Sequence, residues 1–541
     1  MTAALLLTIA LQAQPLPFDV LITGGRIVDG TGTPYFYADI GIRGDSIVSI
    51  GKLSGSQAKV RIEAGGLTIT PGYIDIHSHA IRGIYRTPTA ENCLRQGVTT
   101  LIEGPDGGSP IPLKPELDRL TTTPLSVNFA FCAGHNSIRQ KVMGTERRKP
   151  TAQELERMKL LARQAMLDGA FGLSTGLFYV PGNYAATEEV IELAKAVGEL
   201  GGFHVSHMRD EAAGILDSVR ETIRIGEEGR LPTQLTHHKI IGKTYWGRSV
   251  ETLKLVDEAR ARGVDVTIDQ YPYTASSTGL GSALIPQWAL AGGQQALRER
   301  LKAPQQRARI KQEIVRRIEN ERGGGDPRNI VMASCGHDPA LAGRHLGEIA
   351  QARGRTGVDG AAETAIELQE KGGCSAIFHA ISEDDVERIM RHPVTMIASD
   401  GGVPFFGEDV PHPRSYGTFA RVLGRYVRER KVLTLEQAVF KMSGLPAQRL
   451  KIYDRGILRP GMKADLVILD PATIADKAEF AKPHQYAVGV RDVLVNGQPA
   501  LRNGQVTRDR PGRVLYGPAY SGRLLRAKAI VKYEDSPRTP R

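Results

Sequence analysis

Histidines and carboxylates that follow strand-like segments are the residues of this sequence whose types and spacing could do chemistry. The apolar run at residues 73–76 leads into His77 and His79, which share one face of a strand because successive side chains alternate. Two neighbouring imidazoles can bind one metal ion, although an isolated pair is about as often part of an exposed turn. Later strand ends supply further candidates, which are Glu103, Asp106, His207, His237, His238 and Asp400.

Neutral imidazole and carboxylate oxygen are the ligand types that suit zinc. One strand-end histidine alone is a structural residue at least as often as a ligand, but this whole set in chain order predicts a site for one or two Zn²⁺. Zinc lowers the pKa of a bound water and polarises a carbonyl, which is the chemistry of hydrolysis. A nearby carboxylate must take the proton of that water, and Asp400 is the predicted general base; the alternative is a helix N-cap before Gly401.

The segments that must position these residues alternate between strands and helices. The strand-like runs are YIDIHSH, TTLIEGP, VNFAFCAGH, FGLSTG, FHVSHMR, TQLTHHK, DVTIDQYPY, SAIFHAIS and VTMIASDGG. Such alternation requires a parallel sheet, and about eight units predict a closed α/β barrel. Catalytic residues of such barrels lie at the carboxyl ends of the strands, where the polar residues of these runs fall.

Both ends of the chain read as short strands separated by glycine-containing turns. Residues 15–70 and 447–520 carry this pattern and are predicted to form one small β-sandwich domain. The barrel is predicted to occupy residues 71–446, with a basic helical insert at about 285–350 that could cover its mouth. Residues 521–541 are predicted to be a tail.

Composition excludes several classes of protein. The chain has 541 residues, of which 41% are hydrophobic and 24% charged, as in a globular protein. The formal net charge is +11, and much of the excess lies in residues 298–322, where acids interleave with bases. That pattern favours a solvated helix face over a nucleic-acid surface, and no zinc-finger or RNA-binding motif supports the latter. No run approaches about 18 apolar residues, so we expect no membrane span.

Residues 1–14 resemble a signal peptide, with an apolar stretch at residues 3–11 and small residues before Pro15. They lack basic residues at the start, and the alternative is the frayed beginning of a cytoplasmic protein. Because the apolar stretch is followed by a turn-like segment at Pro15, we expect a periplasmic or secreted protein.

Four cysteines are scattered without the paired spacing of a cysteine zinc site or a disulfide framework. They are Cys93, Cys132, Cys335 and Cys374. We interpret them as small core residues.

A series of motifs in one order resembles the amidohydrolase superfamily, and within it the N-acyl-D-amino-acid deacylase (D-aminoacylase) family. From Asp19 to residue 510 these are GGRIVDGTG, PGYIDIHSH, QGVTTLIEG, GHNSIR, GLSTGLFYVPGNYA, HVSHMRDE, THHK, DQYPYTASST, SDGG, HPRSYGTF and GMKADLVILDP. The resemblance implies a zinc-dependent hydrolase with a (β/α)8 barrel and a β-sandwich. It also implies the reaction, cleavage of the amide bond of a small N-acyl-D-amino acid; selectivity for the D form rests on the resemblance alone.

The resemblance implies which residues share each metal ion. It places His77, His79 and Asp400 around one metal position. It places His207 and His237 around the second.

Two candidate ligand positions, His237 and Asp106, each have a nearby alternative. The family motif S/T-H-x-K matches His237, so the adjacent His238 is expected to be structural. The family carries a cysteine ligand after the second strand, whereas this sequence has Asp106, with Glu103 as the rival. A carboxylate is a harder ligand than a thiolate, which leaves open whether one or two metal ions bind.

Substrate recognition requires a cation for the free carboxylate of an acylated amino acid. The resemblance suggests Lys239 and Tyr271 for this role, with Ser277 close by. Arg209 lies two residues after His207 and could join them as a bidentate partner, although ordinary ion pairing is the alternative for both cations. A further histidine in SAIFHAIS, His379, is expected at a barrel strand end near the pocket.

Three other functions stay open from the sequence. A different C–N hydrolase on the same scaffold, such as a dipeptidase or a cyclic-imide hydrolase, is the nearest. A metal-binding barrel without catalysis is the next, and a nucleic-acid binder is a distant third. The sequence does not decide between a monomer and a homo-oligomer.

Overall fold

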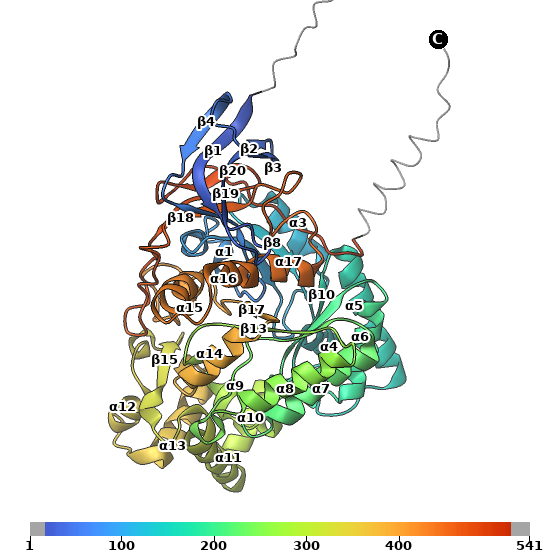
Figure 1. The fold of residues 1–541 in the computed structure, drawn as a ribbon. Helices are drawn as coiled ribbons and strands as arrows, with labels where there is room; N and C mark the ends of the chain where they lie inside the picture. Colours follow the sequence, from blue (N-terminus) through green and yellow to red (C-terminus); the bar gives the residue numbers. More distant parts are fainter. Residues whose placement is uncertain (1–16, 521–541) are drawn as a thin grey trace, which may run out of the picture.

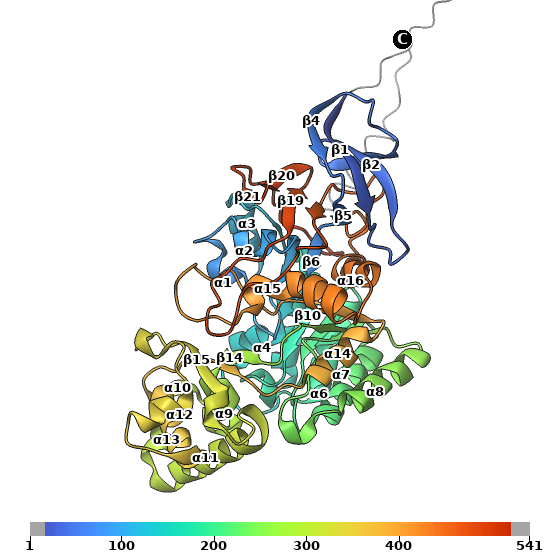
Figure 2. The same cartoon turned by 60° about the vertical axis from the view of Figure 1, so that its left-hand side comes forward.

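The computed structural model describes residues 17–520, so the predicted signal peptide and tail lie outside the described residues. Figures 1 and 2 show three regions along the molecule: a sheet from the two chain ends, a central set of parallel strands with helices, and a lobe of helices α9 to α13 at the opposite end. Within the described part, no helix combines the length and apolar character that crossing a bilayer requires.

The two ends of the chain meet in one nine-stranded sheet. Its strands are β1 (Phe18–Ile27), β2 (Phe36–Arg43), β3 (Ser46–Gly51), β4 (Ala58–Glu63), β5 (Thr68–Pro71), β18 (Leu466–Leu469), β19 (Val490–Val495), β20 (Gln498–Arg502) and β21 (Gln505–Val506). The strand order is β21-β20-β19-β18-β5-β1-β2-β3, with β4 paired to β1. Hydrogen bonds thus join strands from both chain ends into one sheet, as expected of one small β domain built from both ends.

Alternating apolar residues give this sheet its core. Val20 and Ile22 of β1 pack with Ile40 and Ile42 of β2 and with Leu466 of β18. Because these residues recur at every second position, their side chains all point to one face of the sheet.

Nine short strands form the centre of the molecule. They are β6 (Tyr73–Asp75), β7 (Val98–Glu103), β8 (Asn128–Phe131), β9 (Ala133–Gly134), β10 (Gly172–Gly176), β11 (Phe203–His207), β12 (Thr233–Leu235), β13 (Val266–Gln270) and β17 (Thr395–Ile397). All pairings are parallel, in the orders β6-β7-β8 and β9-β10-β11-β12-β13-β17. A parallel bridge between Ser78 and Gly401 links the chain after β6 to the chain after β17.

Helices connect most of these strands, as the alternation predicts. They are α1 (Ile81–Ile84), α2 (Glu91–Leu94), α3 (Lys114–Thr122), α4 (His135–Met143), α5 (Ala152–Asp168), α6 (Thr187–Gly198), α7 (Ile215–Gly229), α8 (Ser249–Ala261), α14 (Glu383–Arg391), α15 (Arg414–Arg421), α16 (Leu435–Met442) and α17 (Gly444–Leu450). Helix α5 begins with a capping box in which Thr151 and Glu154 satisfy each other's backbone N–H groups. Parallel strands bring all their carboxyl ends to one side of the sheet, where the polar residues then meet.

A lobe of about a hundred residues is inserted between β13 and β17. Its elements are β14 (Ser276–Gly279), α9 (Leu280–Leu284), α10 (Gly293–Lys302), α11 (Pro304–Arg317), the π-helical turn η4 (Ile318–Arg322), β15 (Ile330–Ser334), α12 (Leu346–Gln351), α13 (Gly357–Glu370) and β16 (Ser375–Phe378). It has its own apolar core, and its strands pair antiparallel in the order β14-β16-β15.

This lobe corrects two predictions. It extends well beyond residues 285–350, and the run SAIFHAIS supplies its strand β16 and no strand of the central set. An apolar run of four residues looks the same in either sheet, so the sequence alone could not separate them.

The cysteines divide into two pairs of different kinds. Cys335 and Cys374 form a disulfide across 39 residues, so the expectation of isolated thiols is wrong for these two. They meet because Cys335 follows β15 and Cys374 precedes its antiparallel neighbour β16, a pairing that sequence spacing does not reveal. Cys93 and Cys132 are buried free thiols, which confirms their predicted place in the core.

Candidate active site

A cavity of about 1000 Å³ lies between the carboxyl ends of the central strands and the inserted lobe. Residues that follow β7, β11, β12 and β17 line one side of it. The lobe contributes the other side through β14, η4 and the ends of β15 and β16. The site is therefore built by two regions that fold around separate apolar cores.

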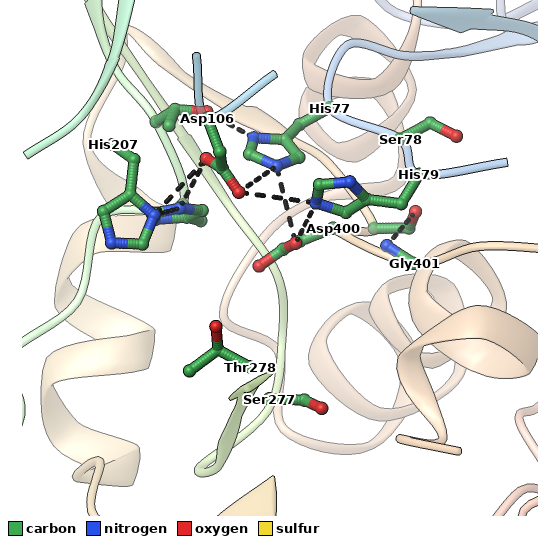
Figure 3. A network of polar contacts seen from close by, with 12 residues as sticks. His77, Ser78, His79, Asp106, His207, Ser277, Thr278, Asp400 and Gly401 are labelled. Carbon is green, nitrogen blue, oxygen red and sulfur yellow. Dashed lines mark hydrogen bonds and ion pairs between the residues drawn. The ribbon is translucent and has the colours of Figure 1, made fainter. Parts of the chain in front are cut away.

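Two histidines and two carboxylates form the first group of candidate metal ligands (Figure 3). His77 Nε2 lies 3.4 Å from Asp400 Oδ1 and 3.6 Å from Asp106 Oδ2. His79 Nε2 lies 3.2 Å from Asp400 Oδ1 and 3.4 Å from Asp106 Oδ2. Each carboxylate oxygen thus faces two imidazole nitrogens, the arrangement that a single cation between them would require.

The other oxygen of Asp106 belongs to a second group. Asp106 Oδ1 lies 3.3 Å from His207 Nδ1 and 3.2 Å from His237 Nε2, and the two imidazole nitrogens are 2.7 Å apart. Asp106 is therefore shared by both groups, with one oxygen facing each. The structure brings together the six residues expected as metal ligands, which are His77, His79, Asp106, His207, His237 and Asp400.

Backbone conformation aims these side chains. Asp106, His237 and Asp400 have positive φ angles of 57°, 37° and 50°. L-residues adopt this left-handed conformation rarely, and holding one there costs about 1–3 kcal/mol. The chain thus turns sharply at the end of three strands and presents the side chain to the shared centre.

The chemistry of the donor set fits a divalent cation. Among residues 17–520, the buried His77 Nε2 has no hydrogen-bond partner although it faces two carboxylates. Burial raises the pKa of Asp106, but the surrounding His77, His237 and His207 outweigh it and hold the pKa well below its usual range. Burial lowers the pKa of His77, yet Asp106 and Asp400 together raise it well above its usual value. The ionised carboxylates therefore attract positive charge to this point, which a bound metal ion satisfies.

A chain of hydrogen bonds orients His77. Thr236 Oγ1 donates to Asp269 Oδ2 and lies 2.6 Å from His77 Nδ1. Because the single hydroxyl proton goes to Asp269, Nδ1 of His77 must be the protonated nitrogen and donates to Thr236. Nε2 of His77 is then the nitrogen that would bind a metal ion held between it and the two carboxylates. Asp269 also accepts from the backbone N–H of His237 at 2.7 Å, so one carboxylate positions a residue of each group.

Glu211 lies behind the second group. Its carboxylate is 3.2 Å from His237 Nδ1 and 3.8 Å from His207 Nε2, and it accepts a hydrogen bond from Lys239 Nζ. Burial raises the pKa of Glu211, but the Lys239 ammonium and the two imidazoles bring it well below its usual range. An ionised Glu211 can hold both imidazoles in place, a role common for carboxylates next to metal ligands.

Asp400 has a cationic partner on the side away from the histidines. Arg414 Nη1 donates to Asp400 Oδ2 at 2.7 Å, which leaves Oδ1 facing His77 and His79. Burial raises the pKa of Asp400, while Arg414 and His77 lower it and bring it well below its usual range. Arg414 also lies over the ring of Tyr271, with its guanidinium carbon 4.9 Å from the ring centre.

The predicted substrate residues differ in where the structure places them. Lys239, Tyr271 and Ser277 line the cavity. Arg209 does not: its guanidinium pairs with Glu221 and donates to two backbone carbonyls. The side-chain alternation used to place it beside His207 holds only within a strand, and β11 ends at His207.

Three other candidates lie away from the shared centre. Glu103 accepts hydrogen bonds from Ser78 Oγ and the backbone of Ala80, and burial raises its pKa to about 7. His238 points to Thr252, and burial lowers its pKa to about 3. His379, directly after lobe strand β16, meets the ring of Phe480 edge-on and does not line the cavity.

Sequence reasoning missed four residues that the structure places around the ligands, which are Glu211, Thr236, Asp269 and Arg414. Glu211 and Arg414 lie within the quoted motifs HVSHMRDE and HPRSYGTF, so their acidic and basic types beside a ligand and a turn were available signals. Nothing in the sequence connects Thr236 and Asp269, because their contact depends on the pairing of β12 and β13.

Comparison with known proteins agrees with this geometry. A family model described as amidohydrolase family matches residues 61–501. D-aminoacylase from Alcaligenes xylosoxydans xylosoxydans is 38% identical, over 93% of this chain and 99% of its own length. The chain belongs to the amidohydrolase family, in its D-aminoacylase group.

Other similar proteins belong to the same group of deacylases. N-acyl-D-glutamate deacylase from the same Alcaligenes is 36% identical over 92% of this chain and 96% of its own length. A solved D-aminoacylase structure is 37% identical with a TM-score of 0.80, over 92% of this chain and 100% of that one. A Bordetella bronchiseptica N-acyl-D-glutamate deacylase, solved with zinc and a phosphonate mimic of the tetrahedral intermediate, is 35% identical with a TM-score of 0.79, over 93% of this chain and 100% of that one.

The hydrogen bonds to Asp269 generate a prediction about metal affinity. Asp269→Asn keeps the shape of the side chain but removes the anionic acceptor that orients Thr236, His77 and His237. We expect the affinity for Zn²⁺ to fall about 10–100-fold, measured by titrating metal-free protein against a competing chelator.

The matched control is Asp257→Asn, which alters an exposed carboxylate beside His392 far from the cavity. This control should bind Zn²⁺ like the wild type. Wild-type affinity in Asp269→Asn would contradict the orienting role.

Proposed function

We propose that this amidohydrolase hydrolyses the amide bond of N-acyl-D-amino acids and releases a carboxylate and a free D-amino acid. The observation that carries the proposal is Asp106, whose two oxygens join two groups of metal-ligand type at the floor of a large cavity. The D-selectivity is inferred from relatives that match over almost the whole chain, namely D-aminoacylase and the N-acyl-D-glutamate and N-acyl-D-aspartate deacylases.

We also propose that the central strands form a (β/α)8 barrel. Counting β8 and β9 as one strand, the parallel pairings run through eight strands from β6 to β17. The bridge between Ser78 and Gly401 supports closure of this ring. In such a barrel the carboxyl ends of the strands carry the chemistry, which agrees with the position of the ligand groups.

Zinc is the metal that the donor set and the relatives support. His77, His79 and Asp400 would hold one ion and His207 and His237 the other, with Asp106 contributing to both. One similar solved structure is a D-aminoacylase with a binuclear metal centre, in which one metal activates and the second metal attenuates. When bound, zinc supplies a water of lowered pKa and polarises the amide carbonyl.

Asp400 is the proposed general base. Arg414 helps keep its carboxylate ionised at neutral pH, and Oδ1 is the oxygen left facing the centre. From this place it accepts the proton of the attacking water and passes it to the leaving nitrogen. Arg414 is accordingly a positioning residue for the base.

Tyr271 is the proposed centre of the site for the substrate's α-carboxylate. Its buried hydroxyl has no hydrogen-bond partner among the described residues and can donate to an anion. Two cations lie near its ring: Lys239 Nζ is 5.6 Å from the ring centre and the Arg414 guanidinium carbon is 4.9 Å from it. Ser277 lines the same cavity and offers a further hydroxyl. Because the Glu211 carboxylate already neutralises the Lys239 ammonium, we propose that Lys239 mainly balances the charge around Tyr271.

Paired enantiomers test the reaction. Zinc-loaded protein should release the amino acid from N-acetyl-D-amino acids at least about a hundredfold faster than from the L forms, because only one enantiomer places its carboxylate at Tyr271. A chelator should abolish the reaction and added Zn²⁺ restore it. Turnover of dipeptides or cyclic imides alone would keep the metal site and refute the substrate assignment.

Three variants test the roles of the ligands. His77→Ala and His237→Ala should lower bound zinc together with activity, because each removes a nitrogen ligand. Asp400→Ala should lower kcat about 10²–10⁴-fold while most of the zinc remains, measured by metal analysis of the same samples.

Lys114→Ala, which alters an exposed ion pair with Asp118, serves as the control and should change neither quantity. Full turnover in Asp400→Ala, or unchanged zinc in His237→Ala, would overturn the assignment.

We further propose that the protein is exported to the periplasm or beyond. The apolar pattern of residues 1–14 supports this, as does the disulfide between Cys335 and Cys374, because disulfides persist in oxidising compartments. Expression of the full chain in a Gram-negative host should give periplasmic protein whose mass lacks residues 1–14. Cytoplasmic protein of full mass, with reduced Cys335 and Cys374, would refute export.

A further inference from the structure

Arg322 is a buried cation on the wall of the active-site cavity. It ends the π-helical turn η4, which continues α11 in the inserted lobe, and its side chain is 4% exposed. Short π-helical segments within α-helices frequently occur at functional sites. The mechanism proposed above gives this residue no role.

The guanidinium of Arg322 has no polar partner within the described part of the chain. Among residues 17–520 it makes no hydrogen bond or ion pair, and its buried Nε has no acceptor. Its contacts are aromatic faces: its guanidinium carbon lies 4.9 Å from the ring centre of Phe178 and 6.0 Å from that of Phe378. These rings offset part of the cost of burial but supply no acceptor for the N–H groups.

The other buried arginines of the described chain all have acceptors. They are Arg139, Arg317, Arg414, Arg449 and Arg455, and each donates to a carboxylate or to carbonyl oxygens. A buried guanidinium without an acceptor is unfavourable, and proteins keep such groups mainly where a ligand completes them. Arg322 is the exception in this structure, and it is the one that lies in the lobe's share of the cavity wall.

The position of Arg322 relates it to the reacting centre. Phe178, on which it lies, stacks against His207 with ring centres 5.6 Å apart. Arg322 is therefore one aromatic ring away from the second ligand group. Arg414 instead contacts Asp400 of the first group. The two cations thus lie beside different ends of the ligand cluster.

The wall around Arg322 is polar. The lobe lines the cavity with hydroxyl groups, from Ser277, Thr278, Ser282, Ser334 and Ser375. Hydroxyls and one free guanidinium suit an anionic group, and they disfavour a large aliphatic side chain, which would leave them without partners.

We propose that Arg322 binds a second carboxylate, on the side chain of the substrate, so that the preferred substrates are N-acyl derivatives of acidic D-amino acids. This inference rests on the proposed function, because it assigns the α-carboxylate to Tyr271 and places the scissile amide at the ligand cluster. A carboxylate on the side chain would make a charge-assisted, bidentate contact with the Arg322 guanidinium. Arg322 is then a specificity-determining residue supplied by the inserted lobe.

The test compares N-acetyl-D-glutamate with its neutral isostere N-acetyl-D-glutamine. Wild-type protein should show the higher kcat/KM for the glutamate. Arg322→Gln should lower that kcat/KM at least about 30-fold and change that for the glutamine less than about threefold. Arg322→Lys should recover part of the loss, because it keeps the charge but not the bidentate geometry.

Arg82→Gln is the matched control, since Arg82 is an exposed cation on the same cavity. It should affect both substrates little, which separates a direct contact from general attraction. Equal losses of kcat/KM for both substrates in Arg322→Gln would overturn the proposal and indicate that Arg322 binds the α-carboxylate. No loss for either would also overturn it.

Binding of the two free products distinguishes failure of this inference from failure of the proposed function. Calorimetric titration of zinc-loaded wild type should show tighter binding of D-glutamate than of D-glutamine, with the difference lost in Arg322→Gln. That result supports the subsite even if no N-acyl-D-amino acid is hydrolysed, an outcome that would refute the proposed function alone. Equal affinities in the wild type would overturn the subsite.

Discussion

The constraint on which this site depends is negative charge held inside the protein. Asp106 and Asp400 are both ionised, and both point at one small space between imidazole rings. Two buried carboxylates at this spacing repel each other unless positive charge lies between or beside them. The surrounding contacts meet this need: Arg414 neutralises one side of Asp400, and the hydrogen bond that His77 Nδ1 donates to Thr236 fixes the ring that faces both acids. A metal ion completes the balance.

The turns at the strand ends direct the side chains of the site. The parallel strands are rigid and buried, so they deliver their last residues to one surface with little freedom. The left-handed conformations of Asp106, His237 and Asp400 then redirect those side chains inward. Strain of this kind persists only where the surrounding structure over-determines it, and here the central sheet does so.

The sequence predicted what depends on local pattern. His77 and His79 could be placed together because alternation within one strand is a local rule, and the motif series located the remaining ligands and the family. What it could not predict depends on contacts between distant segments. The disulfide needs β15 to lie beside β16, and the role expected for Arg209 failed because its strand had already ended. Arg322 was read as part of a solvated basic helix, since its burial arises only when the lobe packs against the loop of Phe178.

The sheet made from both chain ends has a consequence for how the protein is produced. Strand β5, at Thr68–Pro71, pairs with β18, at Leu466–Leu469, so the hydrogen bonds between these two strands must wait until most of the chain has been synthesised. Contacts of such long sequence separation form slowly, because the loop between them must first be closed. The first strands therefore remain incomplete, with an open edge, while the ribosome makes the rest. The nascent chain therefore cannot complete this sheet until strands β18 to β21 have emerged.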